Sequence, residues 1–191
     1  MENDLKKKYQ RQKSKLKRDI LNKKNPDAPI NLEKNLLELN NFNRYKIIAS
    51  YFSVNSELST KFLNKFLLYN KKILCLPVVK HNSKILSFKK YNLNSKLVKG
   101  QFGIFEPIKS SKNLLPDVIL TPCLAFDISG FRLGYGGGYY DKTISYFSSI
   151  GHNFITVGFA YDEQKVGEVV HDNLDQKLNY ILTEKQLYKV S

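Results

Sequence analysis

Residues 117–142, DVILTPCLAFDISGFRLGYGGGYYDK, contain the strongest signal for the fold class. Asp117–Thr121 is rich in apolar and β-branched residues, which is typical of a buried strand. Four of the ten glycines of the chain follow within residues 134–138, and a helical segment is expected near Thr143–Phe147. A strand followed by a helix is the unit that repeats in α/β proteins, and the glycines here connect the two.

The alternation of strand and helix patterns continues on both sides of this stretch. Helical patterns occupy Asn31–Asn40 and the residues after Ser53–Ser56, where Asn55 or Ser56 is expected to cap the helix. We therefore predict an α/β domain with a mostly parallel sheet covered on both faces. The further strand candidates are Tyr45–Phe52, Ile73–Val79, Ile85–Tyr91, Phe154–Ala160 and Tyr180–Leu182.

The N-terminal segment, residues 2–24, is predicted to be a basic amphipathic helix. Its ten basic and three acidic residues supply half of the net charge of +14. Its apolar residues fall on one helical stripe: Leu5, Tyr9, Leu16 and Ile20. We expect this stripe to lie against the domain.

The charge and composition bound the function classes. A net charge of +14 indicates an anionic partner but does not distinguish nucleic acid, phosphorylated ligands and anionic membranes. Only four arginines occur, which disfavours bidentate readout of phosphates or bases, so a specific anion site must use a few placed groups. Cys75 and Cys123 lie in apolar runs, as buried free thiols of a reducing compartment do. No apolar run approaches the roughly 18 residues of a membrane span, so we expect a cytoplasmic protein.

The glycine-rich loop is a candidate phosphate site. Glycines permit positive φ and leave room for a ligand, so successive N–H groups can converge on phosphate oxygens beside a helix N-terminus. Arg132 adds a fixed fork of donors. The loop lacks the Gly-Lys-Ser/Thr ending of a P-loop, and Tyr139 stands where a dinucleotide fingerprint requires a third glycine. An ordinary tight turn is therefore the alternative interpretation.

Several segments carry a family resemblance in the expected order. The glycine-rich segment 126–142 resembles the signature of the 5-formyltetrahydrofolate cyclo-ligase family, also called 5,10-methenyltetrahydrofolate synthetases. The other similar blocks are YFSVNSELST (51–60), ILCLPVV (73–79), GIFEP (103–107), DVILTPCLAFD (117–127), and FAYDEQ (159–164) followed by His171-Asp172. The resemblance spans nearly the whole chain.

This resemblance implies a fold and a reaction. The fold is a three-layer α/β/α single domain over residues 1–191, Rossmann-like and similar to NagB/RpiA/CoA transferase-like proteins. The reaction is the ATP- and Mg²⁺-dependent cyclisation of 5-formyltetrahydrofolate to 5,10-methenyltetrahydrofolate, with release of ADP and phosphate. It proceeds by phosphorylation of the formyl oxygen and attack by N10. Positioning and charge neutralisation suffice for such a transfer, so no covalent enzyme intermediate is expected.

The resemblance also implies the nucleotide and metal residues. Lys7 and Arg11 would reach the nucleotide from one face of the first helix. Arg132 and Asp141 would be catalytic, and Asp141 with Asp172 would hold Mg²⁺. Taken alone, the residues favour a helix-dipole acid for Asp141 and a solvated loop residue for Asp172. The implied ATP-binding loop residues are Arg132, Leu133, Gly134, Tyr135, Gly136, Gly137, Gly138, Tyr139 and Tyr140.

The folate is implied to lie against a buried acid and aromatic rings. A Glu57 carboxylate can accept two parallel hydrogen bonds from the N–H edge of a pterin. The alternatives are that Glu57 only favours the N-terminus of its helix and that the aromatic rings only pack. The implied substrate-binding residues are Phe52, Glu57, Tyr135, Gly136, Gly137, Gly138 and Tyr139, with Glu106 as a lesser candidate.

Two other functions remain open from the sequence. A nucleic-acid-binding module would explain the charge, but it requires aromatic residues among clustered basic ones on one face. A family member that binds without turnover is disfavoured by the intact Arg132, Glu57 and Asp141. We expect 5-formyltetrahydrofolate, including polyglutamylated forms, as the partner of a monomer, with no specific nucleic acid and no membrane.

Overall fold

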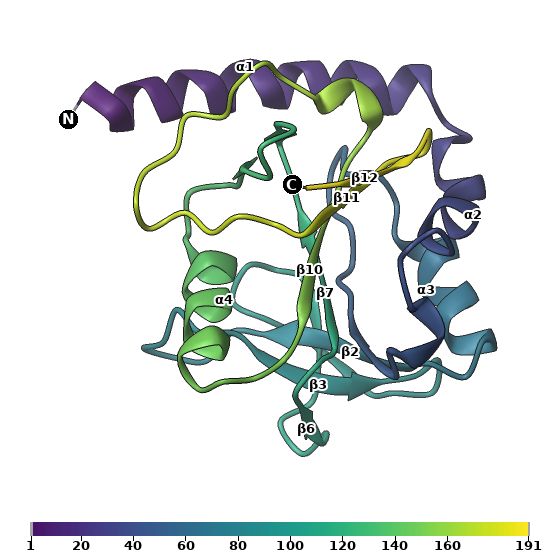
Figure 1. Cartoon of the computed structure of the whole chain (residues 1–191). Coiled ribbons are helices and arrows are strands. Elements are labelled where there is room, and N and C mark those ends of the chain that lie inside the picture. The colour runs from purple at the N-terminus through teal and green to yellow at the C-terminus, as the bar shows by residue number, and fades with distance from the viewer. Residues whose placement is uncertain (1, 191) are drawn as a thin grey trace.

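The central sheet has eight strands in the order β12-β11-β10-β7-β1-β2-β3-β6 in the computed structural model, which describes residues 2–190 (Figure 1). Its strands are β1 (Ile47–Ala49), β2 (Ile73–Val78), β3 (Ser87–Tyr91), β6 (Asn113–Leu114), β7 (Val118–Pro122), β10 (Ile155–Phe159), β11 (Tyr180–Leu182) and β12 (Leu187–Lys189). The helices are α1 (Glu2–Lys24), α2 (Leu32–Leu36), α3 (Lys61–Tyr69) and α4 (Tyr139–Ser149), with short 3-10 turns η1 (Ala28–Asn31), η2 (Phe42–Arg44) and η3 (Asp162–Gln164).

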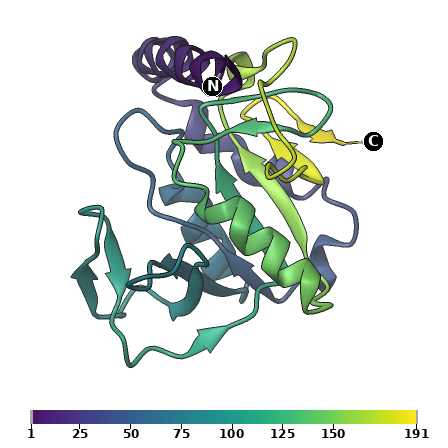
Figure 2. The same cartoon turned by 90° about the vertical axis from the view of Figure 1, so that its left-hand side faces the viewer.

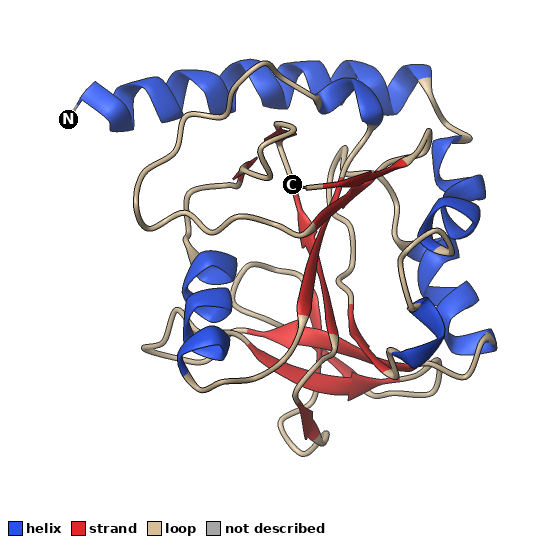
Figure 3. Cartoon of the chain, viewed as in Figure 1, coloured by secondary structure: helices blue, strands red, loops and turns tan. Residues whose placement is uncertain are grey.

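The five inner strands are parallel, and antiparallel strands close both edges. β1 pairs in parallel with both neighbours, so that Ile48 lies between Leu74 of β2 and Val118 of β7. β7, β10 and β11 continue the parallel run. Apolar side chains such as Leu74, Val118 and Ile119 are almost fully buried because helices cover both faces. Figure 3 shows α4 on one face and α2 with α3 on the other, which confirms the predicted α/β fold.

The predicted elements are present, several of them with shorter bounds, and one start is wrong. The strand expected over Tyr45–Phe52 is reduced to β1, and the helix expected over Asn31–Asn40 ends at Leu36. The helix expected directly after Ser53–Ser56 begins only at Lys61, so neither Asn55 nor Ser56 caps it. Residues 53–59 instead form a loop that carries Glu57.

Helix α1 is present over the predicted residues, but its apolar stripe does not face the domain. Leu5, Tyr9, Leu16 and Ile20 are all more than half exposed. The residues that α1 buries are Lys7, Ser14, Arg18 and Leu21. The expectation was wrong because α1 covers a polar site at the carboxyl ends of the parallel strands rather than the apolar core.

Two short hairpins were not predicted because two- and three-residue strands leave no periodic pattern. β4 (Leu97–Lys99) pairs with β5 (Phe105–Pro107), and Figure 2 shows this hairpin projecting from the body. β8 (Ala125–Phe126) pairs with β9 (Arg132–Leu133) just before the glycine-rich loop. Both cysteines are buried and free, as expected. Within residues 2–190, no helix combines the length and apolarity needed to cross a membrane.

Candidate active site

The predicted site residues gather between α1 and the carboxyl ends of the parallel strands, where ligands commonly bind in α/β sheets. The β8–β9 hairpin presents the glycine-rich loop there, with Phe126 paired to Arg132. The buried carboxylate of Asp127 accepts hydrogen bonds from the N–H groups of Phe131 (3.1 Å) and Val169 (2.8 Å). Asp127 thereby fixes the hairpin turn to the loop that carries His171 and Asp172.

The glycine-rich loop leaves backbone donors available beside the N-terminus of α4. Gly136 (φ +94°) and Gly138 (φ +70°) adopt the left-handed conformation that favours glycine, and Gly138 is the N-cap of α4. The N–H groups of Gly136 and Gly137 meet no acceptor within residues 2–190. Arg11 reaches the loop from α1, and its Nε donates to the carbonyl oxygen of Gly134 at 3.0 Å. The loop therefore has the geometry of an anion site with a guanidinium at its edge.

Arg132 and Asp141 form an ion pair at the start of α4. The two side chains are 3.0 Å apart, and Arg132 is 7% exposed. The same Oδ1 of Asp141 accepts a hydrogen bond from the N–H of Gln176 (3.1 Å). Arg132 also lies over the ring of Tyr140, 6.0 Å from its centroid. The two residues predicted to be catalytic are thus in direct contact.

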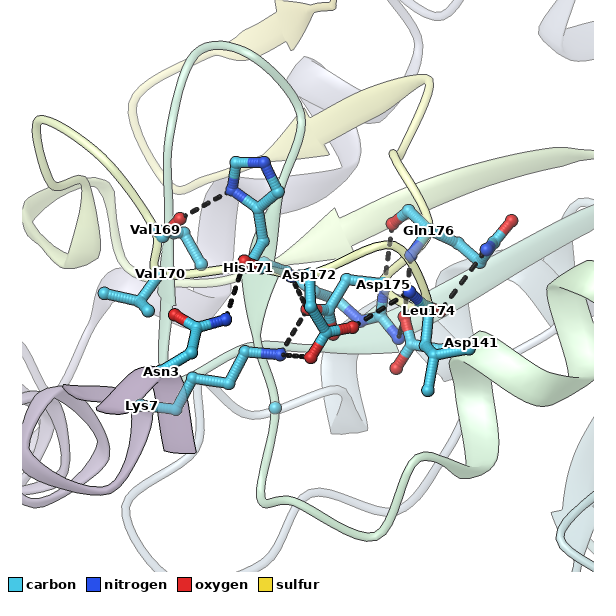
Figure 4. A network of polar contacts seen from close by, with 12 residues as sticks. Asn3, Lys7, Asp141, Val169, Val170, His171, Asp172, Leu174, Asp175 and Gln176 are labelled. Atoms are coloured by element: carbon cyan, nitrogen blue, oxygen red, sulfur yellow. Dashed lines mark hydrogen bonds and ion pairs between the residues drawn. The ribbon is translucent and has the colours of Figure 1, made fainter. Parts of the chain in front are cut away.

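Lys7 joins α1 to the loop after β10 through two carboxylates (Figure 4). Its Nζ lies 2.6 Å from Asp172 Oδ2 and 2.5 Å from Asp175 Oδ2. Burial by itself lowers the pKa of Lys7, but the hydrogen bonds to both aspartates outweigh it and leave the pKa raised. The hydrogen bond from Lys7 lowers the pKa of Asp172. Asp175 was not predicted from the sequence.

Asp141 and Asp172 could hold a metal ion only together with oxygen atoms from a bound phosphate and water. Among residues 2–190, no group of three or more His, Cys, Asp or Glu side chains could hold a metal ion. Asp172 uses both oxygens, one toward Lys7 and one toward the N–H of Leu174. Asp141 leaves Oδ2 without a hydrogen bond in the described chain. One or two carboxylates completed by phosphate oxygens and water suit Mg²⁺, so the donor set fits that ion beside a nucleotide.

Glu57 is buried and held by three different parts of the chain. The Tyr135 hydroxyl donates to Oε1 at 2.5 Å, and the N–H of Val54 donates to Oε2 at 2.9 Å. Burial raises the pKa of Glu57, and these bonds with the charge of Arg18 offset part of the rise. Burial also raises the pKa of Tyr135, so its hydroxyl stays protonated and donates. The acid and one loop tyrosine predicted to bind folate are therefore neighbours.

Arg18 is the main site residue that the sequence reasoning left unassigned. It is 1% exposed, and its guanidinium donates to the Tyr135 hydroxyl (2.6 Å) and the Ser56 hydroxyl (3.2 Å). Ser56 in turn donates to Asp19. The spacing of Arg18 from Lys7 and Arg11 places all three on one helical face, which is the signal that could have identified it.

The remaining predicted residues lie at the margins of this cluster. Half-buried Phe52 packs edge-on against Tyr91, with centroids 5.4 Å apart. Tyr139 packs in the same way against Phe102 at 5.5 Å. Leu133 is buried in an apolar cluster, so only its backbone faces the loop. Glu106 accepts a long hydrogen bond from the N–H of Val79 (3.4 Å) and, among residues 2–190, has no hydrogen bond or ion pair with Glu57 or Tyr135.

The chain is similar to known proteins over most of its length. The family profile of the 5-formyltetrahydrofolate cyclo-ligase family matches residues 3–184. The chain belongs to this family. The cyclo-ligase of Haemophilus influenzae is 40% identical over 142 residues, which cover 72% of this chain and 75% of the relative. The cyclo-ligase of Escherichia coli K12 is 33% identical over 147 residues, which cover 74% and 80% of the two chains.

A solved structure supports the same assignment for the fold. The 5,10-methenyltetrahydrofolate synthetase of Aquifex aeolicus superposes with a TM-score of 0.80 at 28% identity, over 96% of this chain and 92% of that one. This chain is therefore an enzyme of the cyclo-ligase family with the α/β fold of the synthetases. The resemblance found in segment 126–142 is confirmed at the level of the family, whereas the roles of individual residues stay predictions.

Proposed function

We propose that this cyclo-ligase family member converts 5-formyltetrahydrofolate to 5,10-methenyltetrahydrofolate with ATP and Mg²⁺, releasing ADP and phosphate. The observation that carries the proposal is the position of Tyr135. This residue contacts Glu57 through its hydroxyl, and it lies in the loop between Gly134, which binds Arg11, and the N-terminus of α4. A folate at Glu57 and a nucleotide at the loop would therefore be neighbours.

The chemistry requires such neighbours. The formyl oxygen attacks the γ-phosphorus of ATP, an oxygen–phosphorus bond forms, and ADP leaves. N10 then attacks the formyl carbon and loses its proton, and the carbon–oxygen bond breaks as phosphate departs. Two substrates held in line convert the transfer into an effectively intramolecular step, and the enzyme contributes mainly position and charge.

Nucleotide binding is proposed for α1 and the glycine-rich loop. The N–H groups of Gly136 and Gly137 would donate to phosphate oxygens, with Arg11 and Lys7 beside them. Lys7 is paired with Asp172 and Asp175, so a phosphate bound beside it would compete for its charge. Arg132 and Asp141 would lie beside the γ-phosphate, which is the group that is transferred.

Asp141, with Asp172, would hold Mg²⁺ against the phosphates. When bound, Mg²⁺ supplies charge neutralisation and fixes the orientation of the phosphate oxygens. Arg132 orients Asp141 through the ion pair, and the N–H of Gln176 supports the same oxygen. The second oxygen of Asp141 is the group available to the ion.

Folate recognition is proposed for Glu57 with the aromatic rings of Phe52, Tyr135 and Tyr139. The Glu57 carboxylate has lone pairs beyond those that Tyr135 and Val54 use, and they can accept from a pterin edge. The charge of Arg18 favours the ionised form of this buried acid and offsets part of the rise in pKa that burial causes. The basic surface would favour polyglutamylated folate, and equal affinity for mono- and pentaglutamate forms at low salt would contradict that preference.

Absorbance in the methenyl-folate band tests the proposed reaction. The purified chain is mixed with 5-formyltetrahydrofolate, ATP and Mg²⁺, with controls that omit each component and a control with Asp141→Asn. We expect product only in the complete mixture. The enzyme is proposed to act as a monomer in the reducing cytoplasm. No product from folded protein that binds ATP would mean that the substrate or the turnover is wrongly assigned.

A further inference from the structure

The outer face of α1 carries an apolar stripe that no part of the described chain covers. Leu5 is 67% exposed, Tyr9 69%, Leu16 66% and Ile20 53%. Single exposed apolar residues are ordinary on protein surfaces. These four, however, share one side of a helix over about 22 Å, at 1.5 Å per residue. We call them the outer stripe.

Lysines flank the outer stripe on both sides. At 100° per residue, one flank holds Lys13 and Lys17 and the other holds Lys8 and Lys15. Three acidic residues offset only part of the charge of the ten basic residues of this helix. Glu2 forms an ion pair with Lys6, and Asp19 accepts a hydrogen bond from the Ser56 hydroxyl. The exposed lysines of α1 are Lys6, Lys8, Lys13, Lys15, Lys17, Lys23 and Lys24.

The inner face of α1 fixes which way the outer stripe points. Lys7 is bound to Asp172 and Asp175, and Arg18 is bound to Tyr135. Rotating the helix to bury the outer stripe would break these buried contacts, so the exposure is built into the fold. Figures 1 and 2 show α1 along one edge of the molecule with no segment over its outer side. A flat surface can therefore reach the whole face.

We propose that the outer stripe and its lysines dock the enzyme on an anionic lipid surface. Apolar side chains on such a helix enter the boundary of the acyl chains, and flanking lysines bind the phosphate headgroups. A second copy fits poorly, because two lysine-flanked stripes would bring like charges together. RNA would use the lysines but leave the outer stripe in water.

Docking in this orientation is compatible with turnover. The groups of α1 assigned to the nucleotide and to Glu57 point to the opposite side, toward the glycine-rich loop. The expectation of no membrane partner rests on the lack of an apolar run long enough to span a membrane, and this criterion does not test docking at a membrane surface. Four side chains give weak and reversible binding, which ionic strength should tune through the lysines.

Vesicle sedimentation of the full chain tests the proposal. Vesicles of phosphatidylglycerol and phosphatidylcholine in equal parts are compared with phosphatidylcholine alone, at low and high salt. We expect binding only to the anionic vesicles, falling with salt. Leu16→Gln with Ile20→Gln should weaken it at least roughly tenfold. The matched control is Leu37→Gln with Leu93→Gln, two leucines as exposed as these but outside α1, which should leave it unchanged.

A second pair of variants tests the charge. Lys13→Gln with Lys17→Gln should weaken vesicle binding by roughly tenfold or more. Lys61→Gln with Lys65→Gln removes the same charge from exposed positions of α3 and should have a much smaller effect. All variants should retain wild-type turnover, because none touches the site.

Three results would overturn the docking proposal. The first is no binding to anionic vesicles at low salt, and the second is equal binding by the Leu16→Gln/Ile20→Gln variant and wild type. The third is a dimer in analytical ultracentrifugation that the same variant abolishes, since the outer stripe would then belong to a second copy. In a further outcome, RNA displaces the protein from vesicles while the apolar substitutions leave vesicle binding unchanged. That outcome would likewise overturn the proposal, because the lysines alone would then bind the anions.

Discussion

The guanidinium of Arg18 lies 3.7 Å from the carboxylate of Glu57, and both groups are almost fully buried. The Tyr135 hydroxyl bridges them, accepting from Arg18 and donating to Glu57. One Arg18 nitrogen, Nη2, is buried without a hydrogen-bond partner in the described chain. Because the pair is enclosed, each charge depends on the other, and the proposed folate site depends on both.

Removal of Arg18 should therefore destabilise the fold. Arg18→Met leaves the Glu57 carboxylate buried and unpaired, which costs about 3 kcal/mol and lowers Tm by roughly 6–12 °C. Arg44→Met, at an exposed arginine, is the control. Adding Glu57→Gln to Arg18→Met should recover part of the loss, and strictly additive effects in this double-mutant cycle would argue against coupling.

Glu57→Gln should weaken folate binding more than turnover. Losing charge-assisted hydrogen bonds to the pterin should raise KM for 5-formyltetrahydrofolate by roughly 10- to 100-fold with a smaller change in kcat. Since burial raises the pKa of Glu57 above 4.5, KM of the wild type should rise as pH falls through that raised value. The variant should lack this acid limb, whereas exposed Glu38→Gln should keep it.

Asp141→Asn should abolish most turnover while the fold persists. The amide cannot replace a carboxylate beside Mg²⁺, so kcat should fall at least about 100-fold and the Mg²⁺ requirement should shift upward. Circular dichroism checks the fold, and exposed Asp27→Asn is the matched control. Wild-type kcat in Asp141→Asn would remove this residue from the mechanism.

Gly136→Ala should damage the nucleotide site through the backbone. Gly136 has φ +94°, and a Cβ there would lie 3.4 Å from the Arg11 guanidinium. Gly151 (φ +69°) has nothing within 4 Å of the equivalent atom and lies far from the loop. Both alanine variants should lose roughly 1 kcal/mol of stability, but only Gly136→Ala should raise KM for ATP, by roughly tenfold. Equal KM values in the two variants would mean that the loop does not bind ATP.

The Lys7–Asp172 contact predicts a pH window for stability. The pKa of Asp172 is lowered below 3.8, so its contribution is full above that value and is lost as pH falls through the lowered pKa. The pKa of Lys7 is raised above 10.5, so its contribution is full below that value and is lost at higher pH. Urea unfolding should show Asp172→Asn less stable than wild type at neutral pH, with the gap closing in acid. A gap independent of pH would point to packing instead.

The sequence predicts the buried parallel strands well because both of their faces are apolar. Ile73–Val79 is such a run, and it forms β2 almost as predicted. The two-residue strands β8 and β9 leave no pattern to detect. For α1 the helical period is correct but the direction of its apolar face is not, because periodicity does not say whether a helix packs on a core or on a polar site.

The site residues divide in the same way. The glycine-rich loop, Asp141 and Glu57 stand in local motifs, so the family resemblance could propose roles for them. Asp175 and Arg18 gain their roles only from partners 168 and 117 residues away. The helical spacing of Arg18 from Lys7 and Arg11 indicates a shared face, but contacts of that range leave no trace of the partner in a single sequence, and only the fold brings the partners together.

The pairing of the first helix with the last part of the chain affects synthesis. Lys7 precedes Asp172 by 165 residues, and a ribosome adding about 5–20 residues per second needs roughly 10–30 s to cover that interval. Throughout it, α1 is a cationic segment without its counter-ions. The contact between Lys7 and Asp172 thus forms only when nearly the whole chain has emerged, so premature termination should release fragments in which the first helix has no anchor in the C-terminal segment.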